Sequence, residues 1–185
     1  LASLAAAYYD HPSDDLLLVG ITGTNGKTTT SYILTSIFEA AGVTCGRIGT
    51  VGYRINEREL DAPRTTPEAA DLQRMLREMV VEGCGACVME VSSHALSLHR
   101  VDGLRFAAGI FTNLTRDHLD FHGDMESYFA AKRRLFELLP DGAVAVINID
   151  DRRGADMVAA SRRPVTYAID GAAVAGGLDP LVAGS

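Results

Sequence analysis

Residues 16–30 read LLLVGITGTNGKTTT, and this stretch decides the fold. Its apolar run at 16–22 predicts a buried strand, and the pattern over residues 28–41 predicts a helix. Between them lies a glycine-rich turn, GTNGKT at 23–28. Backbone N–H groups in such a turn and at a helix start bind polyphosphates. The full pattern G-x-x-x-x-G-K-[ST] requires glycine at position 21, where this chain has Ile21, so the match is partial.

Short apolar runs alternate with helical patterns along the rest of the chain. Extended segments are predicted at residues 47–55, 86–91, 107–112, 143–149 and 165–168, and helices at 67–82, 125–139 and 151–160. This alternation predicts an α/β fold of the P-loop type, a mostly parallel sheet with helices on both faces. Functional sites in such sheets lie at the carboxyl ends of the strands. From residue 170 the chain loses its periodicity, and we interpret this tail as loop or unfinished domain.

The composition excludes several classes of function. The 185 residues carry a net charge of −7, which argues against a nucleic-acid partner. Because no apolar stretch reaches about 18 residues, no membrane span is expected, and no signal peptide is visible. Cys45, Cys84 and Cys87 suit a reducing, cytoplasmic compartment. Cys84 and Cys87 lack the second pair that a zinc site needs, so we interpret them as buried thiols.

Metal-ligating residue types follow two predicted strands. Glu90 lies near the end of the segment 86–91, where a nucleotide enzyme holds its metal. The segment DHLDFH at 117–122 follows the strand 107–112 and mixes oxygen with nitrogen donors. A neighbouring phosphate site favours Mg²⁺ over zinc. The alternatives are a solvated strand-end charge at Glu90 and a hydrogen-bonded loop without metal.

Lysine is scarce in this chain, which has fifteen arginines but only Lys27 and Lys132. On a helix at 125–139, Lys132 shares a stripe with apolar residues such as Tyr128 and Leu135. Such a lysine either extends its amine to water or loses its proton more easily through burial. Arginine cannot lose its proton, so the scarcity favours a chemical role for the two lysines.

Hydroxyl and basic side chains lie near these positions in sequence. The string RTTP at 64–67 opens the predicted helix, and its hydroxyls either cap that helix or bind substrate. Ser92, Ser93, His94 and Arg100 follow Glu90 and are candidates for an anionic substrate. A Ser–His nucleophile pair is not favoured because no nucleophile elbow surrounds them.

Five ordered strings together resemble the Mur ligases, which are ATP-dependent amide-forming enzymes of peptidoglycan synthesis. The strings are TGTNGKTTT at 22–30, TTPEA at 65–69, MEVSSHAL at 89–96, FTNLTRDHLDFHG at 111–123 and AAKRRLF at 130–136. They are most similar to the branch that adds the third amino acid. The resemblance covers the middle of three family domains. It implies that residues 1–15 link to an absent N-terminal UDP-sugar domain and that 16–185 are the central ATP-binding domain, truncated before an absent amino-acid-binding domain.

The resemblance also implies roles for individual residues. It assigns ATP contacts to Gly23, Thr24, Asn25, Gly26, Lys27, Thr28, Thr29 and Asn113. Catalytic residues would be Lys27, Glu90, His118 and Lys132, and Mg²⁺ ligands would be Thr28, Glu90, His118 and Lys132, the last as a CO₂ carbamate (N6-carboxylysine). Substrate contacts would be Arg64, Thr65, Thr66, Ser92, Leu98 and Arg100, although some members have Asn at position 64 and Gln at position 98.

The expected activity follows from the same resemblance. ATP would activate UDP-MurNAc-L-Ala-D-Glu as an acyl phosphate, and an amine of meso-diaminopimelate or L-lysine would then form the amide. A cytoplasmic monomer is the expectation, and residues 1–185 alone are expected to be inactive. Another Mur-superfamily ligase, such as a folylpolyglutamate or cyanophycin synthetase, is one alternative. A non-catalytic P-loop nucleotide-binding module is the other.

Overall fold

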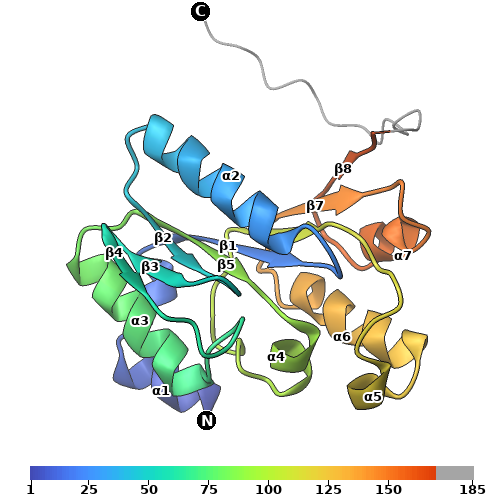
Figure 1. The fold of residues 1–185 in the computed structure, drawn as a ribbon, viewed down its shortest axis with the longest axis horizontal. Coiled ribbons are helices and arrows are strands. Elements are labelled where there is room, and N and C mark those ends of the chain that lie inside the picture. The colour runs from blue at the N-terminus through green and yellow to red at the C-terminus, as the bar shows by residue number, and fades with distance from the viewer. Residues whose placement is uncertain (170–185) are drawn as a thin grey trace, which may run out of the picture.

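An eight-stranded sheet runs through residues 1–169, which are the residues that the computed structural model describes (Figure 1). Its order is β4-β3-β2-β5-β1-β6-β7-β8. The six strands from β2 to β8 in this order all run parallel to one another. Strands β3 and β4 form an antiparallel edge beside β2. The strands are β1 (Leu17–Thr22), β2 (Cys45–Ile48), β3 (Tyr53–Ile55), β4 (Arg58–Leu60), β5 (Ala86–Glu90), β6 (Ala108–Phe111), β7 (Val144–Asn148) and β8 (Pro164–Tyr167).

Helices cover both faces of this sheet, which confirms the predicted fold class (Figure 1). Leu34 and Phe38 of α2 pack on one face, against β1 and β5. Helices α3, α6 and α7 pack on the other face, through residues such as Leu76, Leu135 and Met157. The helices are α1 (Ala2–Tyr8), the 3₁₀ helix η1 (Pro12–Asp14), α2 (Lys27–Ala40), α3 (Ala69–Val81), α4 (Ser93–Ser97), α5 (Leu119–His122), α6 (Met125–Glu137) and α7 (Gly154–Ala159).

Several predicted boundaries were wrong, among them the start of α7, which is Gly154 rather than residue 151. The segment 47–55 is not one extended piece, because residues 49–52 leave the sheet between β2 and β3. Helix α3 does not begin at Pro67 but at Ala69, with Glu68 as its N-cap in an extended conformation. The cause is Thr66, whose buried hydroxyl donates to the carbonyl oxygen of Glu90 at 2.9 Å and holds the preceding chain against β5.

Four short helices (α1, η1, α4 and α5) and the three-residue strand β4 were not predicted. Helices α4 and α5 span five and four residues, too few for a helical period to be visible. Helix α1 lies within the segment that we interpreted as a linker, and it packs on α3. There Arg77 donates to the carbonyl oxygens of Tyr9 at 2.9 Å and Asp10 at 2.7 Å. The assignment of residues 1–15 to a connection between domains stays a prediction.

Other expectations concern burial and hydropathy. Cys45, Cys84 and Cys87 are buried free thiols, as expected. None of the helices among residues 1–169 combines the length and hydropathy that a membrane-spanning segment needs. The tail from residue 170 lies outside the described residues, so its interpretation as loop is not tested.

Candidate active site

The glycine-rich turn follows β1 at the carboxyl edge of the sheet, between the ends of β5 and β6. Strand pairing places Ile21 beside Glu90 and Thr22 beside Phe111. The residues after β6 therefore lie next to the turn, as expected for a site at this edge.

Two glycines give the turn its shape. Gly23 has a φ of 147°, and a Cβ there would lie 1.9 Å from Oγ1 of Thr112, so a larger residue does not fit. Gly26, with a φ of 85°, is the N-cap of α2, and it offers no side-chain cap to this helix. The N–H groups of the first helical turn are therefore available to an anion. This arrangement fits the predicted phosphate site.

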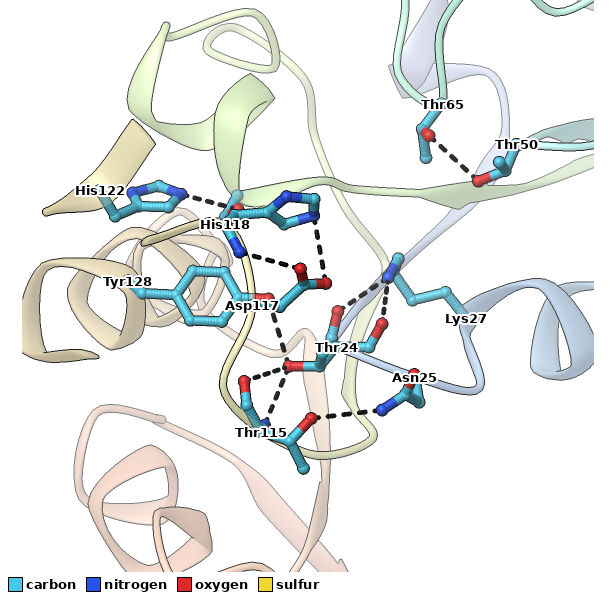
Figure 2. Close-up of polar contacts among 12 residues, drawn as sticks. Thr24, Asn25, Lys27, Thr50, Thr65, Thr115, Asp117, His118, His122 and Tyr128 are labelled. Atoms are coloured by element: carbon cyan, nitrogen blue, oxygen red, sulfur yellow. Dashed lines mark hydrogen bonds and ion pairs between the residues drawn. The ribbon is translucent and has the colours of Figure 1, made fainter. Parts of the chain in front are cut away.

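Residues after β6 brace the turn from the side. Thr112 donates to the carbonyl oxygen of Asn25 at 2.7 Å. The side chain of Asn113 accepts from the N–H of Asn25 at 2.9 Å and donates to its carbonyl at 3.1 Å. Thr24 donates to the carbonyl oxygen of Thr115 at 3.2 Å (Figure 2). Asn113, predicted to contact ATP, thus holds the phosphate-binding turn itself.

Both lysines reach the same point of this turn. Nζ of Lys27 donates to the carbonyl oxygens of Gly23 at 2.8 Å and Thr24 at 2.9 Å (Figure 2). Burial lowers the pKa of Lys27, although the charges of Glu90 and Asp117 oppose this. A lysine folded onto loop carbonyls is free to turn to a phosphate group once one is bound.

Lys132 approaches the turn from α6. Its side chain is 2% exposed, and Nζ donates to the carbonyl oxygen of Gly23 at 2.8 Å. Burial first, and then the charge of Lys27, lower the pKa of Lys132 to about 7. Nζ also lies 4.5 Å from the ring centroid of Tyr128. The alternative in which Lys132 extends to water is therefore wrong for this structure.

Glu90 is 1% exposed, so it is not a solvated strand-end charge. Its Oε1 accepts from Oγ1 of Thr28 at 2.8 Å and from the N–H of Thr50 at 3.1 Å. Its Oε2 accepts from Oγ1 of Thr50 at 3.0 Å. A Cβ at Gly49 would lie 2.4 Å from Oε1, so glycine allows the loop to approach the carboxylate. Because an ionised carboxylate attracts cations, Glu90 and Thr28 offer oxygen ligands suited to Mg²⁺.

The predicted substrate residues lie on the other side of Glu90. Oγ1 of Thr65 is 3.0 Å from Oγ1 of Thr50 (Figure 2). The hydroxyl of Thr66 is occupied inside the protein, since it also accepts from the N–H of Ser92 at 3.1 Å. Ser92 is the N-cap of α4, where its Oγ accepts from Ala95. Thr65 is thus better placed than Thr66 to meet a ligand.

The remaining substrate candidates surround the start of α3. Arg100 is mostly buried and pairs with Glu68 at 2.7 Å, and it donates to the carbonyl oxygen of Thr66 at 3.3 Å. Arg64 is exposed and lies 3.4 Å from the same carboxylate of Glu68. Leu98 is 52% exposed, so its side chain is available for an apolar contact.

His118 lies in a cluster of rings formed by the segment after β6 and by α4. Its Nε2 is 3.4 Å from Oδ2 of Asp117 (Figure 2). Its ring centroid is 5.0 Å from that of His94. His122 forms a 2.9 Å hydrogen bond with Oγ of Ser93. Burial lowers the pKa values of His94 and His122. From the sequence, His94 was a candidate for an anionic substrate and His122 belonged to the metal-ligating residue types at 117–122. The structure places the ring of His94 beside those of His118 and His122.

Within residues 1–169 no three His, Cys, Asp or Glu side chains gather closely enough to hold a metal by themselves. The structure brings Thr28 and Glu90 together but does not join His118 and Lys132 to them as a complete ligand set. Mg²⁺ commonly keeps waters and phosphate oxygens beside one or two carboxylates, so Thr28 and Glu90 fit a metal held partly by a nucleotide.

Gly49, Thr50 and Thr112 are site residues that the motif analysis missed. Gly49 and Thr50 come from the irregular loop after β2, and Thr112 directly follows β6. Their partners in the site, Glu90 and Asn25, are distant in sequence. No local sequence pattern therefore indicates the role of these residues. The nearest signal is the pair of glycines at 49 and 52, which marks an irregular segment.

Comparisons with known proteins agree with this geometry. The curated relatives include the UDP-N-acetylmuramoyl-L-alanyl-D-glutamate–2,6-diaminopimelate ligases of Geobacter metallireducens and Chlorobaculum tepidum. The first is 52% identical over 171 residues and the second 54% identical over 159. These matches cover 89% and 86% of this chain but 34% and 31% of the relatives, so the chain spans about a third of their length.

Solved structures show the same fold. A ligase with the same description superposes with a TM-score of 0.80 and 31% identity, covering 92% of this chain and 36% of that one. E. coli FolC superposes with a TM-score of 0.69 and 20% identity over 90% of this chain and 45% of that one, a likeness of fold alone. The sequence profile described as the Mur ligase middle domain matches residues 21–178. With its turn, sheet and buried lysine in the arrangement described above, the chain belongs to the Mur ligase middle domain family.

Proposed function

We propose that this chain is the ATP-binding part of a cytoplasmic ligase that adds 2,6-diaminopimelate to UDP-MurNAc-L-Ala-D-Glu. The observation that carries the proposal is Lys132, an amine buried against the phosphate-binding turn with its pKa lowered to about 7. A protein that only binds nucleotide has no need of such a group.

In this proposal the turn from Gly23 to Thr29 and its brace Asn113 hold the ATP phosphates. Lys27 leaves the carbonyls of Gly23 and Thr24 and turns to the phosphates, where its charge offsets the approach of two anions. Thr28 and Glu90 would bind Mg²⁺ beside the phosphates, and Glu90 and His118 would bind a second Mg²⁺. Bound Mg²⁺ would neutralise the charge that develops on the transferred phosphoryl group.

Lys132 would take up CO₂ as a carbamate, which replaces a cation with a metal-directed carboxylate. The neutral amine is the form that attacks CO₂, and burial favours that form. Arginine cannot undergo this reaction, which agrees with the scarcity of lysine.

The reaction would occur in two steps. The γ-phosphoryl group of ATP passes to the free carboxylate of the D-Glu residue and yields an acyl phosphate with ADP as the leaving group. An amine of the incoming amino acid then attacks the acyl carbon and expels phosphate. Arg64, Thr65, Thr66, Ser92, Leu98 and Arg100 would bind the acceptor. The hydroxyl of Thr65 contacts Thr50, which in turn donates to the carboxylate of Glu90.

The names of the relatives support diaminopimelate rather than L-lysine as the added amino acid. The selecting residues would belong to a part of the longer protein outside this chain, as would the UDP-sugar domain that residues 1–15 would connect. A monomer is the proposed state. FolC shares the fold. The strings TTPEA and MEVSSHAL favour the cell-wall branch over a folylpolyglutamate or cyanophycin synthetase.

A product assay tests this function on the protein extended to the length of its relatives. With UDP-MurNAc-L-Ala-D-Glu, meso-diaminopimelate and MgATP, we expect an amide product of the summed mass less water, with one ADP and one phosphate released. Parallel reactions with L-lysine, or with a folate and L-glutamate, separate the related ligases. ATP binding without any amide product would instead support a non-catalytic module.

A further inference from the structure

The loop between β2 and β3 joins the two sides of the candidate site. Residues 49–52 leave the sheet there, and Gly49 and Thr50 lie against the carboxylate of Glu90. Thr50 supplies two of the three donors that this carboxylate accepts, one from its N–H and one from its hydroxyl. The third donor is Thr28 of the phosphate-binding turn. Thr50 therefore orients the carboxylate that faces the nucleotide site.

The same hydroxyl also contacts the acceptor side. Oγ1 of Thr50 lies 3.0 Å from Oγ1 of Thr65 (Figure 2). It also lies 3.0 Å from Oε2 of Glu90. A hydroxyl has one hydrogen, and an ionised carboxylate only accepts. Thr50 must therefore donate to Glu90 and accept from Thr65. The two hydrogen bonds therefore run in one direction, with Thr65 donating to Thr50 and Thr50 donating to Glu90.

This direction has a consequence when an anion binds beside Thr65. Its hydroxyl hydrogen turns to the anion, because a charged acceptor forms the stronger hydrogen bond. Thr50 then loses its donor, and its own hydrogen bond to Glu90 weakens, because linked hydrogen bonds polarise one another. The carboxylate keeps more of its negative charge for a cation at Thr28 and Glu90.

We propose that Thr50 is a positioning residue that couples the acceptor site at Thr65 to the nucleotide and metal site at Glu90. The inference rests on the proposed function, since that function assigns the two ends of these hydrogen bonds. Thr50 touches neither reacting group, and it acts through the side chains on either side of it.

The test measures how acceptor binding changes nucleotide binding in the protein extended to the length of its relatives. The coupling factor is the dissociation constant of a non-hydrolysable MgATP analogue without UDP-MurNAc-L-Ala-D-Glu divided by that with it. We expect Thr50→Val and Thr50→Ala to lower this factor roughly two- to tenfold relative to wild type. Thr50→Ser keeps the hydroxyl and should restore it to within about twofold.

The same variants separate orientation from stability. In Thr50→Val the N–H of residue 50 and the hydroxyl of Thr28 still hold Oε1 of Glu90, so MgATP-analogue affinity without the acceptor is measured separately from the coupling factor. Thr44→Val is the matched control, because Thr44 is exposed at the opposite end of β2. Its coupling factor and affinity should match those of wild type. Thermal melting checks that each variant is folded.

Wild-type coupling in both Thr50→Val and Thr50→Ala would overturn the inference, as would a wild-type coupling factor of one. If the wild-type protein nevertheless forms the amide product, only the coupling through Thr50 is contradicted, and the proposed function stands. If wild type binds the analogue but forms no amide, the proposed function fails by itself.

Discussion

Lys27 and Lys132 donate hydrogen bonds to one and the same atom, the carbonyl oxygen of Gly23, at 2.8 Å each. These are the only lysines in the chain. The charge of Lys27 adds to burial in lowering the pKa of Lys132. Two ammonium groups at one carbonyl oxygen repel each other. Either a bound phosphate or the loss of one proton reduces this repulsion. The proposed function uses both.

Replacement of Lys132 tests its proposed modification. Lys132→Ala should lower ligation by at least about a hundredfold, because an oriented charge at the reacting phosphate is removed. An added short-chain carboxylate should restore part of the rate by occupying the vacated space. Lys132→Arg keeps a positive charge but cannot form a carbamate, so it should be as inactive as Lys132→Ala. Initial rates of ADP release measure all three, and a wild-type rate in Lys132→Arg would contradict the carbamate.

The pH dependence of Lys132 gives a second prediction. Its pKa is lowered from 10.5 to about 7, so the amine is protonated below pH 7 and cannot attack CO₂ there. With ¹³C-bicarbonate, the NMR signal of the carbamate should rise between about pH 6 and about pH 8, the range in which an amine with this pKa loses its proton. Lys132→Met should show no such signal. A signal independent of pH over this range would contradict a lowered pKa.

The same shift predicts a change in stability. Between pH 7 and 10.5 the unfolded chain binds the proton of Lys132 while the folded protein has released it. The free energy of unfolding contributed by this group therefore rises with pH across that window. Denaturant unfolding without CO₂ should show a smaller rise in Lys132→Met than in wild type.

The sequence predicts most of the fold because its central strands, β1, β2 and β5, are buried on both faces. Strand β5 is buried throughout, so it reads as an apolar run in which Glu90 is the single acid. That contrast identified both the strand and the site residue. The α3 boundary was missed because Thr66 holds the preceding chain through a contact with β5. Helices α4 and α5 were missed because they are too short for a period.

The candidate site was only partly predictable for a related reason. The glycine-rich turn is continuous in sequence, so its proposed role can be predicted from a short motif. Thr50 lies in the loop after β2, and Thr112 directly follows β6. Nothing in the residues beside them indicates that Thr50 contacts Glu90 or that Thr112 contacts Asn25. Lys132 was predicted from its stripe and its rarity. That it shares an acceptor with Lys27 is visible only once α6 packs beneath the turn.

Gly49 tests how closely the loop must approach Glu90. In Gly49→Ala a Cβ would lie 2.4 Å from Oε1, and this carboxylate cannot move freely because Thr28 and Thr50 hold it. We expect a loss of about 1–3 kcal/mol in the free energy of unfolding. The Mg²⁺-dependent part of nucleotide affinity should also fall.

Gly52→Ala is the control for Gly49→Ala, because a Cβ at Gly52 would have its nearest neighbour, the carbonyl oxygen of Leu60, at 3.4 Å. Chemical denaturation and calorimetric titration of MgADP compare the two variants. Equal effects from both substitutions would mean that the loop, rather than contact with Glu90, causes the change.

Thr112 tests whether the phosphate-binding turn needs its brace. Thr112→Val keeps the shape of the side chain but removes the 2.7 Å hydrogen bond to the carbonyl oxygen of Asn25. Asn113 still donates to that oxygen at 3.1 Å, so the turn keeps part of its support. Nucleotide affinity should fall about two- to tenfold, the range for one neutral hydrogen bond. Thr112→Ser retains the hydroxyl and should bind MgADP as wild type does. Equal affinity of the valine and serine variants would show that packing against Gly23, rather than this hydrogen bond, holds the turn in place.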